Sequence, residues 1–158
     1  MLLSTLFAIH HTTTLMFGVY ISAFFLGVKQ NKKNTILLSG VCAFLGILHA
    51  IVFLLSGAIT SLQFYPFITH IPLVFFLILY YKYPPAISCI SVFFAYLCCQ
   101  ISNWIGLLAL YLTSSMECYY FARILTTIVV FFFLCIFVCR TTEFILFQQE
   151  GSDLLGRG

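Results

Sequence analysis

The stretch TILLSGVCAFLGILHAIVFLLS, from Thr35 to Ser56, contains no charged side chain. As a helix rising 1.5 Å per residue, it is long enough to cross the roughly 30 Å hydrocarbon core of a bilayer. The rest of the chain has the same character, since 63% of its 158 residues are hydrophobic and only 7% are charged. Soluble domains carry about 25% charged residues, so too little polar material is present here to cover a globule in water. The sequence therefore predicts an integral membrane protein.

Polar or proline-containing segments divide the apolar sequence into five predicted transmembrane helices. Their approximate bounds are 2–28, 35–56, 67–81, 86–112 and 123–138. The third is short for a bilayer, so it either begins earlier, at Gln63, or lies in a thin region of the membrane. Helices are expected because backbone groups in lipid must bond within their own segment. We predict an all-α, polytopic membrane helix bundle over residues 1–140, followed at 141–158 by a short cytoplasmic tail or truncated linker.

The basic residues predict the orientation of the bundle. One side of the membrane receives six of them and the other receives only Arg123, the six being Lys29, Lys32, Lys33, Lys82, Arg140 and Arg157. By the positive-inside rule, this split places the amino terminus outside and the tail in the cytoplasm. The basic residues form no dense face, so the lipid bilayer is an expected partner and nucleic acid is not.

Seven cysteines and four histidines raise the question of metal, redox or haem chemistry. No Cys-x-x-Cys motif is present, and cysteines inside apolar runs behave as small apolar residues. His10 and His11 are adjacent, so one at most faces a given site, and no second histidine pair repeats the arrangement at another depth. We expect no metal and no cofactor. A small transport subunit or a redox subunit that binds haem remains the alternative function.

A polar face on the fourth predicted helix is the most informative local feature. Tyr96, Gln100 and Asn103 recur at helical spacing, and amides in hydrocarbon must face the bundle. Two interpretations stay open: the amides form hydrogen bonds between helices, or they form the floor of a pocket open to the outside. In the second interpretation, the predicted ligand-binding residues are Tyr65, His70, Tyr96, Gln100, Asn103 and Trp104.

No catalytic pattern is recognisable in the sequence. Three of the four acidic residues lie in the tail, and Glu117 stands alone on the outer side. A nucleophile with a base, a pair of carboxylates and a phosphate-binding loop are all missing. We predict that this chain is not an enzyme.

Two runs in the centre of the chain resemble a known family. They are YPFITHIPL at residues 65–73 and SVFFAYLCCQISNWIG at residues 91–106, with Lys82 and a nearby proline between them. Together they resemble the amino-terminal membrane sensor region of GHKL-type histidine kinases of Gram-positive bacteria, which is similar to that of the peptide-sensing kinases of quorum systems. The resemblance covers about residues 63–112.

The resemblance implies a multi-pass receptor of a two-component system in the bacterial cytoplasmic membrane. Such a receptor detects an extracellular signal, a peptide in the quorum systems, and acts as a homodimer. In the family, a cytoplasmic ATP-binding region follows and phosphorylates a response regulator. No such region lies within residues 1–158, so kinase activity is not carried over to them. We expect a sensor module that relays its signal through the last helix and the tail.

Overall fold

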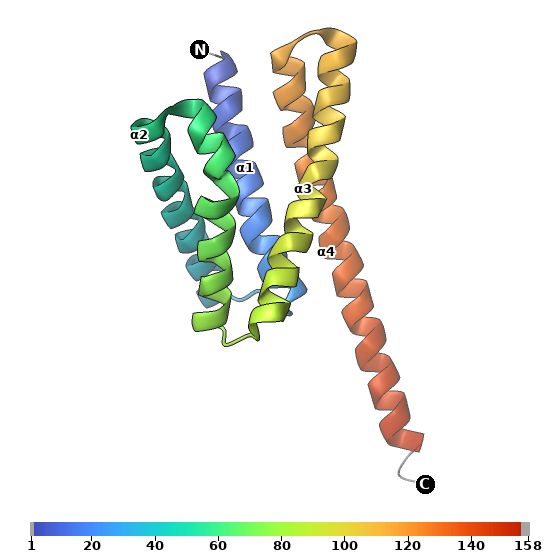
Figure 1. The fold of residues 1–158 in the computed structure, drawn as a ribbon. Coiled ribbons are helices and arrows are strands. Elements are labelled where there is room, and N and C mark those ends of the chain that lie inside the picture. The colour runs from blue at the N-terminus through green and yellow to red at the C-terminus, as the bar shows by residue number, and fades with distance from the viewer. Residues whose placement is uncertain (1, 156–158) are drawn as a thin grey trace.

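The computed structural model describes the backbone of residues 2–155 and the side chains of residues 2–57, 60 and 63–137. Within these bounds the chain contains helices and turns and no β-strand. The four continuous elements are α1 (Leu2–Phe25), α2 (Lys32–Leu79), α3 (Pro85–Thr113) and α4 (Met116–Leu155), as Figure 1 shows. The predicted all-α fold is therefore confirmed.

The long element α2 is a hairpin of two helical arms. Gly57 interrupts it with φ 81° and ψ 171°, a backbone conformation that is essentially restricted to glycine. The first arm, Lys32–Gly57, is long and apolar enough to cross a membrane, and the second, Gln63–Leu79, is a shorter apolar helix. Figure 1 shows the second arm returning beside the first. The predicted third helix thus begins at Gln63, the earlier of its two expected starts.

Five helical segments therefore follow one another in the predicted order. In the part of the chain described here, four are long and apolar enough to span a membrane: α1, the first arm of α2, α3, and residues Met116–Phe137 of α4. Helix α4 begins at Met116 rather than near Arg123, and it ends at Leu155 rather than near residue 138. The earlier start changes the position of one charged residue. This difference makes Arg123 a residue of the helix interior instead of a loop residue.

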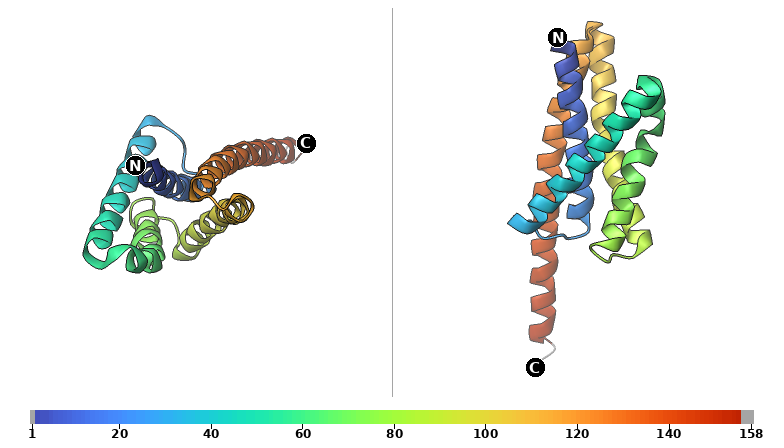
Figure 2. Two further views of the ribbon diagram at one scale, coloured as in Figure 1. Left: turned by 90° about the horizontal axis from the view of Figure 1, so that it is seen from above. Right: turned by 90° about the vertical axis from the view of Figure 1, so that its left-hand side faces the viewer.

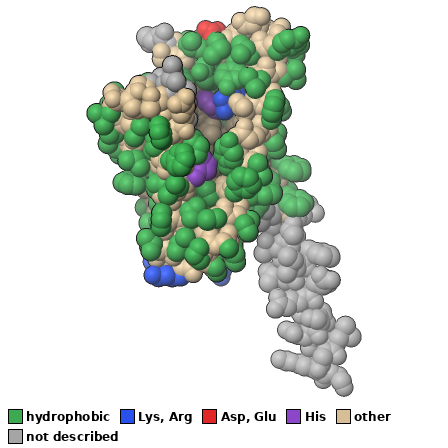
Figure 3. Space-filling view, in the orientation of Figure 1, with side chains coloured by type: hydrophobic (Ala, Val, Ile, Leu, Met, Phe, Trp, Pro, Cys, Tyr) green, Lys and Arg blue, Asp and Glu red, His purple; other side chains and the backbone are tan. Residues whose placement is uncertain are grey.

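The two connections that contain lysines lie at the same end of the bundle, which we call the lysine end. They join α1 to α2 and α2 to α3, and the Tyr83 Oη donates a hydrogen bond across them to the carbonyl oxygen of Leu26 at 2.6 Å. The amino terminus and the α3–α4 turn lie at the opposite, amino-terminal end (Figure 1). Figure 3 shows Lys or Arg side chains at the lysine end. The direction of the bundle across the membrane stays a prediction.

Helix α1 is the centre of the packing, because it contacts each of the other three elements. Seen from above, it lies between α2 and α4 (Figure 2). One apolar cluster joins α1 to α2 and α3 around Val19, Leu38 and Val92, and a second joins α1 to α3 around Ile21 and Ala95. The outer faces are apolar as well, with Leu55 83% exposed, as expected for a surface that lipid surrounds.

Hydroxyl side chains supply hydrogen bonds between the helices. The Ser91 Oγ on α3 donates to the carbonyl oxygen of Ser22 on α1 at 2.5 Å. The Thr127 Oγ1 on α4 donates to the Ser102 Oγ on α3 at 3.0 Å, in a buried position. Bonds of this kind between transmembrane helices contribute about 0.6 kcal/mol each on average. They fix the register of neighbouring helices without a charged residue.

The carboxyl-terminal part of α4 leaves the bundle at the lysine end. Its backbone remains helical to Leu155. Figures 1 and 2 both show this part of α4 extending beyond the other elements. We predicted that the helix bundle ends at residue 140, but the α4 backbone continues through this position without a break. The side chains of the predicted tail, 141–158, lie outside the described residues.

Candidate functional site

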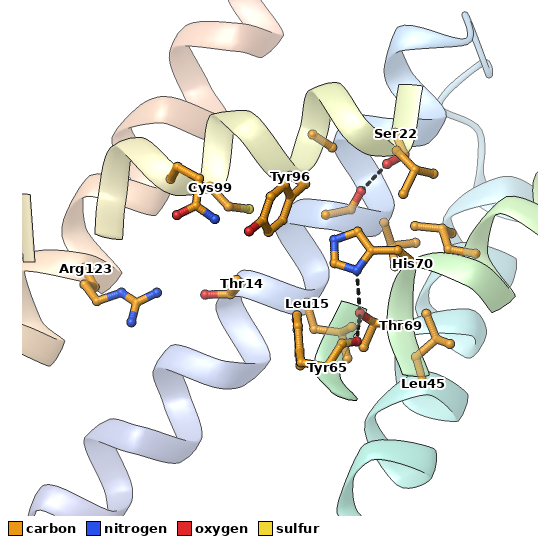
Figure 4. A pocket seen from close by; sticks show the side chains of 16 residues that line it. Thr14, Leu15, Ser22, Leu45, Tyr65, Thr69, His70, Tyr96, Cys99 and Arg123 are labelled. Carbon is orange, nitrogen blue, oxygen red and sulfur yellow. Dashed lines mark hydrogen bonds between the residues drawn. The ribbon is translucent and has the colours of Figure 1, made fainter. Parts of the chain in front are cut away.

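A cavity of about 160 Å³ lies between all four elements of the bundle. Each element contributes at least one polar side chain to its wall, as Figure 4 shows. The polar lining residues used below are Thr14 of α1, Tyr65 and His70 of α2, Tyr96 and Gln100 of α3, and Arg123 of α4. Figure 3 shows histidine and basic side chains in a hollow on the surface toward the amino-terminal end.

Four of the six predicted ligand-binding residues line this cavity, namely Tyr65, His70, Tyr96 and Gln100. The other two do not. Asn103 lies between α3 and α4, and Trp104 is 70% exposed on the outer face of α3. The structure therefore brings the first four together and separates Asn103 and Trp104 from them. Ligand binding itself stays a prediction for all six.

The two amides of the predicted polar face have different surroundings. Gln100 lines the cavity, and its amide forms no hydrogen bond with any residue that the structure describes. The Asn103 Oδ1 accepts a hydrogen bond from the Tyr119 Oη at 3.5 Å. The geometry therefore matches the pocket interpretation at Gln100 and the interhelical interpretation at Asn103.

Arg123 is a cavity residue that the sequence analysis missed. It lies seven residues after Met116, or about 10 Å along the helix at 1.5 Å per residue. Its Nη1 donates to the Tyr119 Oη at 2.5 Å, and its guanidinium carbon is 5.2 Å from the centre of the Tyr119 ring. Its Nε is buried and has no hydrogen-bond partner.

A charged side chain inside a membrane span is rare because it is costly, at about 2.5 to 3.5 kcal/mol near the helix centre. No acidic residue lines the cavity, and Glu117 is exposed on the first turn of α4. The available signal was the four-residue spacing of Tyr119, Arg123 and Thr127, which places all three on one face of α4. In the structure this face is toward α3, where Tyr119 and Thr127 form their hydrogen bonds. A polar stripe of this kind inside an apolar helix indicates a bundle-facing surface.

Histidine and tyrosine rings form a continuous cluster beside the cavity. The rings of His11 and His49 are 4.4 Å apart between centres, and each is 5.3 Å from Tyr65. Tyr65 is 5.9 Å from His70, which in turn is 5.2 Å from Tyr96. The His70 Nδ1 is also 2.9 Å from the Thr69 Oγ1, a contact that orients the imidazole. Tyr65 therefore links the first arm of the α2 hairpin, through His49, to the cavity wall.

This arrangement bears on metal and haem binding. Because the rings of His11 and His49 contact each other, they leave no space between them for the plane of a haem. Within the described residues, no three His, Cys, Asp or Glu side chains are placed to hold a metal ion together. The cavity instead offers hydroxyl, amide, imidazole and guanidinium groups within an apolar wall.

No family model, curated protein or solved structure matches the chain. The resemblance to the sensor regions of histidine kinases therefore stays a prediction from the two central sequence runs.

Proposed function

We propose that this chain is the membrane sensor module of a histidine-kinase-like signalling protein in a bacterial cytoplasmic membrane. One observation carries the proposal: the cavity is lined by all four elements, including α4 through Arg123. The same α4 continues past the lysine end (Figure 1). A ligand in the cavity therefore contacts α4, the helix that extends out of the bundle at the lysine end.

The positive-inside rule supports the direction of this relay. If the lysine end faces the cytoplasm, the cavity lies toward the outside and α4 projects into the cytoplasm. A ligand shifts α4 from one position to another only if it binds the protein more tightly when the helix is in the second position. Arg123 supplies such a contact, because its side chain lies between α4 and the cavity.

The proposal includes the partners that the resemblance implies, which are an extracellular peptide signal and a second copy of the chain. Catalysis is assigned to a cytoplasmic kinase region and not to these residues. Of the alternative functions, haem binding between His11 and His49 is disfavoured, because these two rings contact each other.

The test is a fusion of residues 1–158 to a dimeric reporter kinase, with autophosphorylation as the readout. We expect Arg123→Met and Gln100→Leu to change the basal output, since both residues line the cavity. Leu108→Met is the matched control, on the exposed face of α3 and outside the cavity lining. Equal output from all three variants, at equal amounts of folded protein, would contradict the proposal.

A further inference from the structure

We propose that the cavity binds the carboxylate of a small, otherwise apolar ligand through the guanidinium of Arg123. This carboxylate site adds a class of ligand to the proposed sensor function. It rests on that function, because it takes the cavity to be the site where the signal binds.

The charge of the cavity selects an anion. Arg123 is the one formally charged side chain in its lining, and no carboxylate of a described residue forms an ion pair with it. A single fixed positive charge in an apolar wall is matched by a monoanion. A phosphate that carries more than one negative charge would remain partly uncompensated there, which favours a carboxylate.

The hydrogen bonds of Arg123 leave one edge of the guanidinium for a ligand. Nη1 is engaged by the Tyr119 Oη, whereas Nε is buried and has no partner. Nη2 has no hydrogen-bond partner among the described residues and is the nitrogen open to a ligand, whereas the covered Nε joins it in pairing with both oxygens of a planar carboxylate only when the side chain turns. The bond from Nη1 to Tyr119 holds the side chain on the α3 side of α4.

Two further polar groups line the same cavity. Figure 4 shows the Arg123 side chain pointing toward Thr14 of α1. The Gln100 amide also lines the cavity and has no hydrogen-bond partner among the described residues. Its NH₂ group can donate to a carboxylate oxygen. The Thr14 Oγ1 lies 3.4 Å from the His10 Nδ1, so its hydroxyl can donate to the carboxylate when that ring nitrogen carries the proton. The three side chains come from three different helices, so a bound carboxylate would tie these helices together.

The size and lining of the cavity define the rest of the ligand. Its volume of about 160 Å³ is similar to that of a cavity of roughly 150 Å³ that holds benzene. Part of the wall is apolar and includes Leu15, Leu73 and Val92. A carboxylate with a short apolar body fits this space, either as a free small acid or as the carboxyl-terminal residue of a peptide.

The test uses the purified full chain in lipid nanodiscs, with titration calorimetry and thermal unfolding as readouts. The probes are hexanoate, its neutral amide hexanamide, hexyl phosphate, and the peptide acetyl-Ala-Ala-Leu with a free or an amidated carboxyl terminus. We expect at least one of the two acids to bind, and its amide to bind roughly tenfold more weakly or not at all. Binding of hexanoate alone identifies a small acid as the source, and binding of the free peptide identifies a peptide terminus.

Variants at residue 123 complete the experiment. Arg123→Met is expected to abolish the preference for the acid over its amide, and Arg123→Lys to keep part of it, because lysine preserves the charge but not the bidentate edge. Leu108→Met, on the exposed face of α3 and outside the cavity lining, is expected to bind as the unmodified chain does. If Arg123→Met does not fold, the comparison of acid with amide on the unmodified chain still decides the question.

Three results would overturn the carboxylate site: neither acid binds, acid and amide bind equally, or hexyl phosphate binds more tightly than hexanoate. The last would indicate a lipid headgroup as the anion. The proposed sensor function fails separately, because it is measured as output of the reporter fusion. Acid binding without any change in output would leave the site standing and contradict the sensor.

Discussion

The side chain of Arg123 on α4 lies directly against Gly106 on α3. A Cβ atom at residue 106 would overlap the Cγ and Cδ atoms of Arg123 and lie 3.2 Å from the ring of Tyr119. Gly106 is buried between the two helices. The missing side chain at this position therefore lets the aliphatic part of Arg123 pack on α3 while its guanidinium reaches the cavity.

Replacing Gly106 is expected to displace Arg123. We predict that Gly106→Ala lowers the free energy of unfolding by about 1 to 3 kcal/mol, as overpacking of a closely packed site does. It should also weaken any binding that depends on the guanidinium. Gly40→Ala is the matched control, since no atom lies within 4 Å of a Cβ built there. Chemical denaturation in detergent measures both variants, and equal stability would contradict the close packing.

The α2 hairpin depends on the backbone of Gly57. With φ 81° and ψ 171°, this residue is in a region that side chains exclude, so Gly57→Ala should cost about 1 to 3 kcal/mol. At Gly46 a Cβ would be 3.6 Å from the Leu15 Cδ2, an ordinary contact, and Gly46→Ala should be nearly neutral. Thermal unfolding followed by circular dichroism compares the two. A Gly57→Ala protein as stable as Gly46→Ala would mean that the two arms are joined in another way.

Substitutions of the two amides on α3 should have different effects. Asn103→Leu removes the hydrogen bond from Tyr119 and is expected to cost about 1 kcal/mol of stability. Gln100→Leu removes no hydrogen bond to a described residue, so it should leave stability nearly unchanged and alter the output of the reporter fusion. Stability and output are measured on the same two variants. The opposite result, a stability loss at Gln100 and none at Asn103, would mean that Gln100 bridges helices.

Orientation can be tested with one native cysteine. Cys118 is exposed near the start of α4, and Gln30 is exposed at the lysine end. In intact cells, a variant with Cys118 as its sole cysteine should react with a membrane-impermeant thiol reagent. A variant with Gln30→Cys as its sole cysteine should react only after the cells are broken. Labelling of residue 30 from outside would reverse the orientation and place the cavity toward the cytoplasm.

The sequence by itself determined the class of fold and the number of helices. Uncharged stretches such as Thr35–Ser56 have one stable form in lipid, because their backbone groups must bond internally. Helical spacing also placed Tyr96 and Gln100 on one face, and the structure finds both in the wall of the cavity. These properties are local, so a pattern of a few residues along one helix is enough to predict them.

Only the tertiary structure decided which polar residues share a site. Arg123 is far from Gln100 in the sequence and was assigned to a loop, because a charge at the edge of an apolar run usually marks its end. Its place in the wall depends on Gly106, a residue of another helix. The same dependence separates Asn103 from Gln100, since Tyr119 lies opposite only one of them. Contacts between helices follow from their relative rotation and distance, which the periodicity of one helix does not contain.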